Sequence, residues 1–185
     1  MEHELIDWYD ENGNCKGVID KAIAHKKGLW HKSVHVWIVN DKNQILMQKR
    51  CAKKKFFPNY WDCSFAGHIA AGEKSLISAI REGEEELGLK LKPKDFKFLF
   101  TIKEDFAWKD IVSREFVDVF VLKKNVNLED LRYQQEEVEC AQYFEMAEIF
   151  KHDRSSNIFP HVDEYERLNQ IFKNFENNLG EKNER

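Results

Sequence analysis

The chain has 185 residues, of which 42% are hydrophobic and 13% aromatic, and this composition excludes a disordered protein. The net charge of −4 and the pI near 6.0 give no basic footprint for duplex nucleic acid, whereas a small phosphorylated ligand would need only a local basic patch. No apolar run reaches the roughly 20 residues that span a bilayer, so we expect no membrane segment.

The cysteines predict a reducing environment. They are widely spaced, form no CxxC pair and follow no secretory leader: Cys15, Cys51, Cys63 and Cys140. We therefore expect a cytoplasmic protein. The length favours a single domain over residues 1–178, followed by a frayed tail over residues 179–185, and leaves the oligomeric state open.

Two β-hairpins are predicted in the first 50 residues. Residues 4–10 and 15–20 flank a polar turn and predict an N-terminal β-hairpin. Residues 33–40 and 45–50 flank a second polar turn, and apolar and polar side chains alternate along the first of these segments. The proline within residues 56–62 favours a loop or an edge strand there.

The second half of the chain mixes strands and helices. Residues 96–103 and 114–122 predict two further strands, and residues 141–150 predict a strand that runs into a short helix. A final helix is predicted over residues 161–178, where apolar side chains recur at helical spacing: Tyr165, Leu168, Ile171 and Phe172. This order predicts one α/β domain with a mixed sheet between helices.

Residues 67–89 bring a glycine-rich turn, an arginine and four clustered glutamates together in one short segment. On a helix, one buried stripe would be formed by Leu76, Ile80, Gly83 and Leu87. The other side would carry Glu82, Glu85 and Glu86, whose like charges repel one another by a few tenths of a kcal/mol per pair. A divalent cation would relieve that repulsion. Carboxylate oxygens suit Mg²⁺ or Mn²⁺, and Mg²⁺ completes its octahedron with water and phosphate oxygens, so we expect a phosphorylated substrate.

The residues around these glutamates fit the same interpretation. Gly67 begins a glycine-rich turn, where the backbone can approach a ligand closely. Arg81 lies one turn before Glu85 and can pair with that carboxylate or with Glu73, which would orient the cluster. Gly83 costs a helix roughly 1 kcal/mol relative to Ala, so its place on the apolar stripe predicts close packing against a strand.

The segment resembles the signature of the Nudix hydrolases. A glutamate run on a helix is more often a solvated face, but the spacing here is specific. The signature reads Gly, five residues, Glu, seven residues, then Arg-Glu-U-x-Glu-Glu-x-Gly-U, where U is aliphatic. The matching residues are Gly67, Glu73, Arg81, Glu82, Glu85, Glu86, Gly88 and Leu89, and only the first U departs, being Gly83. The resemblance implies the Nudix fold and Mg²⁺-dependent cleavage of a diphosphate.

The surrounding sequence resembles the isopentenyl-diphosphate isomerase branch of that superfamily, from about residue 4 to residue 175. In that isomerase three histidines and two glutamates hold a metal, a cysteine and a glutamate move the protons, and a tryptophan faces the carbocation. The residues at or near the metal positions here are His25, His31, His68 and Glu115, and Ser113 replaces the first glutamate. A single histidine such as His35 is more often structural.

Three departures argue against isomerase chemistry. Ala66 replaces the proton-carrying cysteine, and Cys63, three residues earlier, is a poor substitute. His161 stands in place of the tryptophan. In addition, isomerases of this type often lose the helix glutamates that this chain keeps. We infer an isomerase-like scaffold with hydrolase chemistry.

The resemblance assigns roles to individual residues. Glu82, Glu85 and Glu86 would hold the metal, with Glu82, Glu85 and Arg81 also in the catalytic set. The base would be a helix glutamate or Glu115, which is nearly as well interpreted as a solvent-facing strand residue. The positions that would bind the substrate are Arg50, Lys54 and Gly67. Lys54 belongs to a lysine run that a solvated loop would explain equally well.

Three functions follow as alternatives. The first is a pyrophosphohydrolase acting on a nucleoside diphosphate linked to another group or on a related small molecule. The second is isopentenyl-diphosphate isomerase, and the third is a Nudix binding module without turnover. Nudix proteins differ in the loops that contact the rest of the substrate, so the motif does not specify which diphosphate is used.

Overall fold

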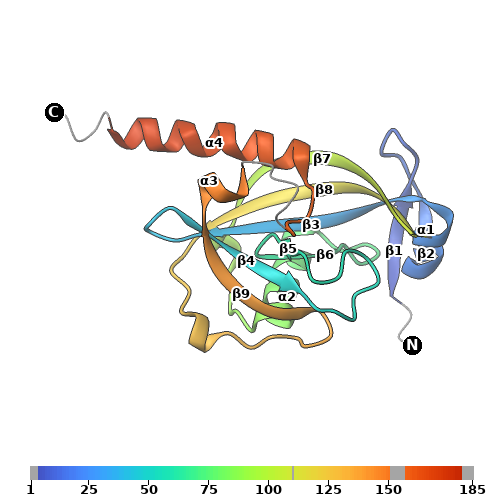
Figure 1. Ribbon diagram of the computed structural model, residues 1–185. Helices are drawn as coiled ribbons and strands as arrows, with labels where there is room; N and C mark the ends of the chain where they lie inside the picture. Colours follow the sequence, from blue (N-terminus) through green and yellow to red (C-terminus); the bar gives the residue numbers. More distant parts are fainter. Residues whose placement is uncertain (1–3, 110, 151–156, 181–185) are drawn as a thin grey trace.

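The computed structural model describes residues 4–109, 111–150 and 157–180, with side chains described as far as residue 173 in the last of these. In this part of the chain nine strands pair into one sheet (Figure 1): β1 (Leu5–Tyr9), β2 (Cys15–Asp20), β3 (Trp30–Val39), β4 (Gln44–Arg50), β5 (Trp61–Asp62), β6 (Phe65–His68), β7 (Lys97–Trp108), β8 (Ile111–Lys123) and β9 (Val138–Glu145). The helices are α1 (Lys21–Lys27), α2 (Ser75–Leu87), α3 (Met146–Ile149) and α4 (Val162–Gly180), with 3₁₀ turns η1 (Pro93–Asp95) and η2 (Leu128–Asp130).

The predicted N-terminal hairpin is confirmed. β1 and β2 pair antiparallel from Leu5 opposite Asp20 to Tyr9 opposite Cys15. The turn between them is held by Asp10, whose carboxylate accepts hydrogen bonds from the backbone and side chain of Asn14. This hairpin attaches to the start of β3 and lies at the end of the sheet that also carries α1 (Figure 1).

β3 is the central strand and makes the sheet mixed. Along its whole length it pairs parallel with β8, from Trp30 opposite Arg114 to Val39 opposite Lys123. On its other edge it pairs antiparallel first with β6 and then, at its end, with β4. The second predicted hairpin, β3 with β4, is therefore confirmed, and the sheet divides where β6 gives way to β4.

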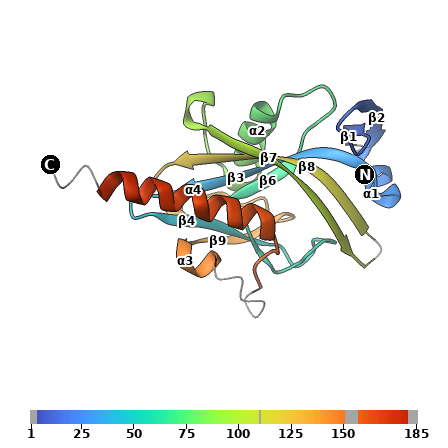
Figure 2. The same ribbon diagram turned by 90° about the horizontal axis from the view of Figure 1, so that it is seen from above.

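Helices cover both faces of the sheet, with α2 on one side and α4 on the other (Figures 1 and 2). The core under α2 includes Val34, Val36 and Phe65, and the core under α4 includes Trp37 and Leu168. The predicted mixed sheet between helices is thus confirmed. Because both faces are covered, the polar side chains that alternate along β3 are buried as well, unlike those of a strand with one solvated face.

Three local predictions need correction. Helix α1 was not predicted. This short helix begins after Asp20, whose side chain accepts from Ala22 N, and ends at Gly28 in the left-handed region. β3, β7 and β8 are longer than predicted because pairing continues beyond the apolar runs. Helix α4 extends to Gly180, two residues into the predicted tail, and residues 181–185 lie outside the described residues.

Within the described residues, no helix is both long and apolar enough to cross a membrane. The described cysteines are all free thiols.

Candidate functional site

The three glutamates of the signature lie on α2, but they do not share one exposed face. Glu82 and Glu86 are buried against the sheet, and Glu85 is about half exposed. The predicted stripe is correspondingly displaced, because Leu76 and Ile80 are only partly buried. The buried face of α2 is formed instead by Ser78, Ala79, Glu82, Gly83, Glu86 and Leu87.

Two glycines allow this inward placement. A Cβ at residue 67, on β6, would lie 2.0 Å from Cδ of Glu82, so only glycine leaves room for that carboxyl group. A Cβ at residue 83 would lie 2.8 Å from Leu91 Cδ1 and 3.0 Å from Phe65 Cζ. The predicted close packing of Gly83 against a strand is confirmed, since Phe65 belongs to β6. Together the two glycines draw α2 onto β6 and set Glu82 into the gap.

Arg81 connects the carboxylates to one another and to the strand. Its guanidinium donates to Glu82 Oε1 at 2.6 Å, to Glu85 Oε2 at 3.2 Å and to Glu73 Oε2 at 3.3 Å. It also donates to the backbone oxygen of His68 at 3.1 Å. The predicted pairs with Glu85 and Glu73 are both present, and the contact with Glu82 joins them. A planar fork of donors can fix several carboxylates at once in this way.

The buried carboxylates hold their protons more tightly than free ones. Burial, followed by the nearby charge of Glu82, raises the pKa of Glu86 to about 8. Burial also raises the pKa of Glu82 to about 7, with Glu85 adding to the effect and Arg81 opposing it. Glu86 Oε2 accepts from Gln48 Nε2 at 2.9 Å and from Ala66 N at 3.3 Å. Two desolvated carboxyl groups on one helix face are the hard oxygen donors that suit Mg²⁺ or Mn²⁺, so the donor set fits a divalent cation.

The two predicted substrate-binding cations have different surroundings. Lys54 forms an ion pair with Glu137. Its charge also lies near enough to Glu86 to oppose part of the rise in the pKa of that carboxyl group. Arg50 donates to Asp62 Oδ2 at 2.9 Å and to the backbone oxygens of Phe56 and Phe57. The guanidinium of Arg50 therefore holds the 56–60 loop, whereas Lys54 faces the carboxylate site.

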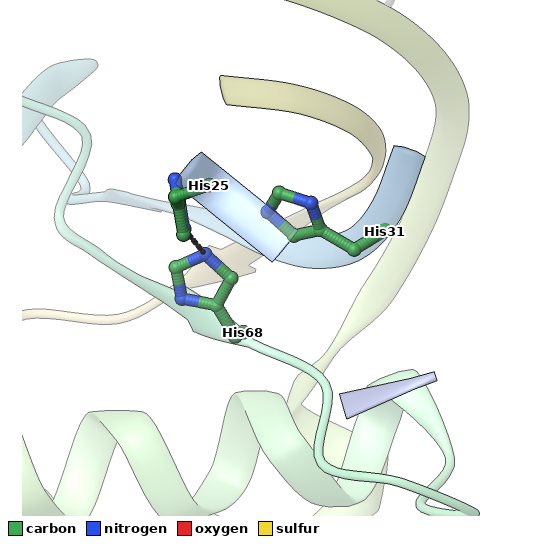
Figure 3. A group of neighbouring side chains, drawn as sticks. All are labelled: His25, His31 and His68. Carbon is green, nitrogen blue, oxygen red and sulfur yellow. Dashed lines mark hydrogen bonds between the residues drawn. The ribbon is translucent and has the colours of Figure 1, made fainter. Parts of the chain in front are cut away.

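Three histidines form a second candidate metal site beside the first (Figure 3). His25 is on α1, His31 on β3 and His68 on β6, and one nitrogen of each lies within 4.8 Å of the others. His25 Nε2 and His68 Nε2 are 3.2 Å apart. Glu115, on the neighbouring strand β8, places Oε1 3.6 Å from His31 Nε2 and 3.9 Å from His68 Nε2, and Ser113 donates to it. Glu115 thus belongs to this histidine cluster.

The histidine cluster has the properties of an imidazole ligand set. Among the described side chains, His31 Nε2 is buried without a hydrogen-bond partner. Burial lowers the pKa of His25 to about 4 and lowers that of His68 well below its ordinary value, so both rings are uncharged near neutral pH. Burial raises the pKa of Glu115, but the neighbouring His31 outweighs it, so this carboxyl is held ionised. Three imidazoles and a carboxylate suit a transition metal such as Zn²⁺.

Several contacts at the site could not be read from the sequence. Gln48, on strand β4, donates to Glu86, and the charge of Glu137, in the segment before β9, acts to raise the pKa of Glu86; neither residue belongs to a local motif. The segments are brought together only by the pairing of β4 with β9. Among the contacts between distant segments, only the histidine cluster was indicated by the sequence. The resemblance to the isomerase branch placed His25, His31 and His68 at or near metal-ligand positions of that family.

The sequence of the chain is similar to those of known proteins over most of its length. A NUDIX domain family profile matches residues 29–164. An uncharacterised Nudix hydrolase of Clostridium acetobutylicum is 36% identical over 141 residues, which cover 75% of this chain and 68% of that protein. Nudix hydrolase 3 of Arabidopsis thaliana is 38% identical over 149 residues, 77% of this chain but only 19% of that longer protein. Isopentenyl-diphosphate Delta-isomerase 1 of Photorhabdus laumondii is 34% identical over 124 residues, 66% of this chain and 69% of that protein.

Solved structures share the fold at lower sequence identity. A protein of Deinococcus radiodurans superposes with a TM-score of 0.69 at 18% identity, covering 89% of this chain and 98% of that one. The NUDIX domain of Shewanella oneidensis NrtR, solved with ADP ribose, gives a TM-score of 0.56 at 14% identity and covers 76% of this chain and 86% of that one. These similarities support the fold and leave the ligand undetermined.

Proposed function

The chain belongs to the Nudix hydrolase superfamily, and from this we propose that it is a metal-dependent pyrophosphohydrolase that cleaves a diphosphate linkage in a nucleoside diphosphate derivative or a related small molecule. The observation that carries this proposal is the burial of two acidic side chains, Glu82 and Glu86, on α2. Gly67 leaves the room that the carboxyl group of Glu82 occupies. Burying two acidic groups side by side costs stability, and a bound cation would offset that cost.

The residues of the site would divide the work as follows. Glu82, Glu85 and Glu86 would hold Mg²⁺, or Mn²⁺, which neutralises phosphate oxygens and lowers the pKa of water when bound. Arg81 would hold Glu82 and Glu85 in position for the metal. The room left by the missing Cβ of Gly67 is taken by the carboxyl group of Glu82, so Gly67 would position that ligand beside the substrate. Lys54 would contact a phosphate oxygen as a point charge.

Glu85 and Glu115 are the two candidates for the base that takes the proton from water. Glu85 is the more exposed of the helix glutamates and is held by Arg81 alone in the contacts described. Glu115 is ionised but is surrounded by His31 and His68, which would make it a ligand in the histidine cluster. We therefore propose Glu85 as the base and Glu115 as a ligand of a second cation held with His25, His31 and His68.

Isomerase activity is the second candidate function and is disfavoured because the chain lacks a reactive thiol at the required position. Ala66 offers no proton donor on β6, opposite His35. Cys63 is fully buried, its thiol donates to the backbone oxygen of Phe65, and burial raises its pKa well above the ordinary value. Neither residue supplies the acidic, accessible thiol that the isomerase reaction requires. A binding module without turnover would retain the fold but has no need for the buried glutamates.

The proposal is tested by a Mg²⁺-dependent hydrolysis screen. The panel holds nucleoside di- and triphosphates, sugar nucleotides, ADP ribose, dinucleotides, coenzyme A and prenyl diphosphates, and the two phosphorylated products of each cleavage are separated and quantified, with Glu86→Gln as the blank. We expect one class to be cleaved by the unaltered chain and not by the variant. Allylic isomer from the prenyl arm would favour the isomerase, and binding without cleavage across the panel would favour the binding module.

A further inference from the structure

A second cluster of histidines and carboxylates lies on the α4 side of the sheet, in a part of the molecule that the proposed chemistry does not use. His35 is on β3, Glu104 on β7, Glu164 on α4, and His161 directly precedes α4. One ligand atom from each of these four residues lies within 4.8 Å of all the others. The four side chains come from three parts of the chain and are all largely buried.

The contacts within this cluster pair each histidine with one carboxylate. His35 Nδ1 lies 2.7 Å from Glu164 Oε2. His161 Nδ1 lies 2.7 Å from Glu104 Oε1. The two rings are packed against each other, with centroids 4.6 Å apart. Both pairs therefore direct a nitrogen and an oxygen toward one small volume between β3, β7 and α4.

A second layer of partners holds two of the four side chains, His161 and Glu164, in place. Asp62 Oδ1 lies 2.9 Å from His161 Nε2, the ring nitrogen that faces away from Glu104, and Asp62 is itself held by Arg50. Trp37 Nε1 donates to the other oxygen of Glu164 at 2.6 Å. A carboxylate on the distal nitrogen of a histidine, and a donor on the distal oxygen of a carboxylate, are the supports that orient metal ligands in proteins.

We propose that His35, Glu104, His161 and Glu164 form a binding site for a divalent transition-metal ion, with Zn²⁺ the best match to two imidazoles and two carboxylates. The charges agree with this assignment. Three carboxylates, those of Asp62, Glu104 and Glu164, face Arg50 and the two imidazoles. With neutral imidazoles, the two positive charges of the cation and the one of Arg50 balance these three carboxylates, so the occupied site carries no net buried charge.

The four ligand atoms must rearrange to surround the ion. Ligand atoms about 2.0–2.1 Å from Zn²⁺ at tetrahedral angles stand roughly 3.3 Å apart, so each 2.7 Å pair opens by about 0.6 Å, and the wider separations, which reach up to 4.8 Å, close by up to about 1.5 Å. The distal nitrogen of His161 keeps its hydrogen bond to Asp62 in that arrangement. An ion held this way joins α4 to β3 and β7, so it stabilises the docking of the C-terminal helix on the sheet.

The test separates this site from the two others and measures metal binding without any hydrolysis assay. Excess Mg²⁺ occupies the α2 carboxylates, and the double variant His25→Gln with His68→Gln removes two ligands of the histidine cluster. In that background we expect one equivalent of Zn²⁺ by equilibrium dialysis and metal analysis. Adding Glu104→Gln, which keeps the size of the side chain, should weaken Zn²⁺ binding by roughly tenfold or more.

A second measurement avoids any change to the proposed ligands. X-ray absorption of Zn²⁺ bound to the double variant should give two imidazole ligands, because only His31 remains in the other cluster. Absence of bound Zn²⁺ in the double variant, one imidazole or none in its spectrum, or unchanged Zn²⁺ affinity after a folded Glu104→Gln substitution would each overturn the proposal. Circular dichroism of each variant establishes that it is folded.

Discussion

Gly67 on β6 lies directly against the carboxyl group of Glu82 on α2, where a Cβ would stand 2.0 Å from Cδ. Gly67→Ala must therefore displace Glu82 or separate helix from strand. A displacement of about 1 Å at a catalytic group can cost roughly 10²-fold, so we expect kcat/KM to fall by that order. Steady-state hydrolysis at saturating Mg²⁺ measures it.

The matched comparison for this prediction is Gly83→Ala, which adds the same methyl group at the same helix–strand contact, but on α2 and against Leu91 and Phe65. This substitution should change the free energy of unfolding, and it should leave kcat/KM within a few-fold of the value for the unaltered chain. Equal losses of activity in both variants would show that general damage to α2, rather than the position of Glu82, controls turnover.

Glu86→Gln should abolish most hydrolysis, because it removes a metal ligand while keeping its hydrogen-bond geometry to Gln48. Metal-held charge stabilisation contributes several kcal/mol to such reactions, so we expect a loss of roughly 10²-fold or more in kcat. Glu84→Gln is the control, since Glu84 is exposed on the same helix. Full activity of Glu86→Gln would exclude Glu86 as a ligand.

Stability of the metal-free protein should fall as the pH rises. The pKa values of Glu82 and Glu86 are raised to about 7 and about 8, whereas an unfolded glutamate titrates near 4.3. Between about pH 5 and pH 8 the folded chain binds more protons than the unfolded chain, so its stability decreases with pH and levels off above that range. Thermal unfolding in EDTA across this range measures the trend, and added Mg²⁺ should oppose it.

The same experiment on Glu86→Gln isolates the contribution of one group, because other buried acids and histidines also titrate. We expect the variant to lose less stability than the unaltered chain over the same interval. A decline of equal size in both proteins would assign the pH dependence to other groups.

Glu164 should matter to folding more than any exposed acid of α4. It is fully buried, accepts from Trp37 and pairs with His35, so Glu164→Ala leaves two buried polar partners unsatisfied. Loss of one member of a buried pair costs about 3–5 kcal/mol. Urea unfolding followed by tryptophan fluorescence measures the change. Glu166→Ala, at an exposed position, should stay within about 0.5 kcal/mol of the unaltered chain.

We expect Arg50 to be a structural residue and Lys54 to be a substrate-binding residue. Arg50→Lys loses the fork that holds Asp62 and the backbone of Phe56 and Phe57, so we expect a lower melting temperature. Lys54→Gln should raise KM with a small change in kcat and in stability. The assignment is reversed if Arg50→Lys raises KM at unchanged stability while Lys54→Gln has no kinetic effect.

Local spacing predicted a large part of this protein. The N-terminal hairpin, the pairing of β3 with β4, the glutamate helix and the helix at the C-terminal end all follow from short-range patterns, because hydrophobic period and turn residues act over a few positions. The short helix α1 was missed since its seven residues carry no amphipathic repeat, although Asp20 and Gly28 mark its ends.

The signature by itself determined that Glu82, Glu85 and Glu86 lie within one turn of each other and that Arg81 can reach them, because helical geometry fixes neighbours at three and four residues. Only the tertiary structure decided that Glu82 and Glu86 are buried while Glu85 is exposed, since that depends on Gly67 from another element. The same holds for His35 and Glu164, which are 129 residues apart in sequence and in contact in the fold. Such contacts are set by strand pairing and helix docking over the whole chain, and no local pattern encodes them.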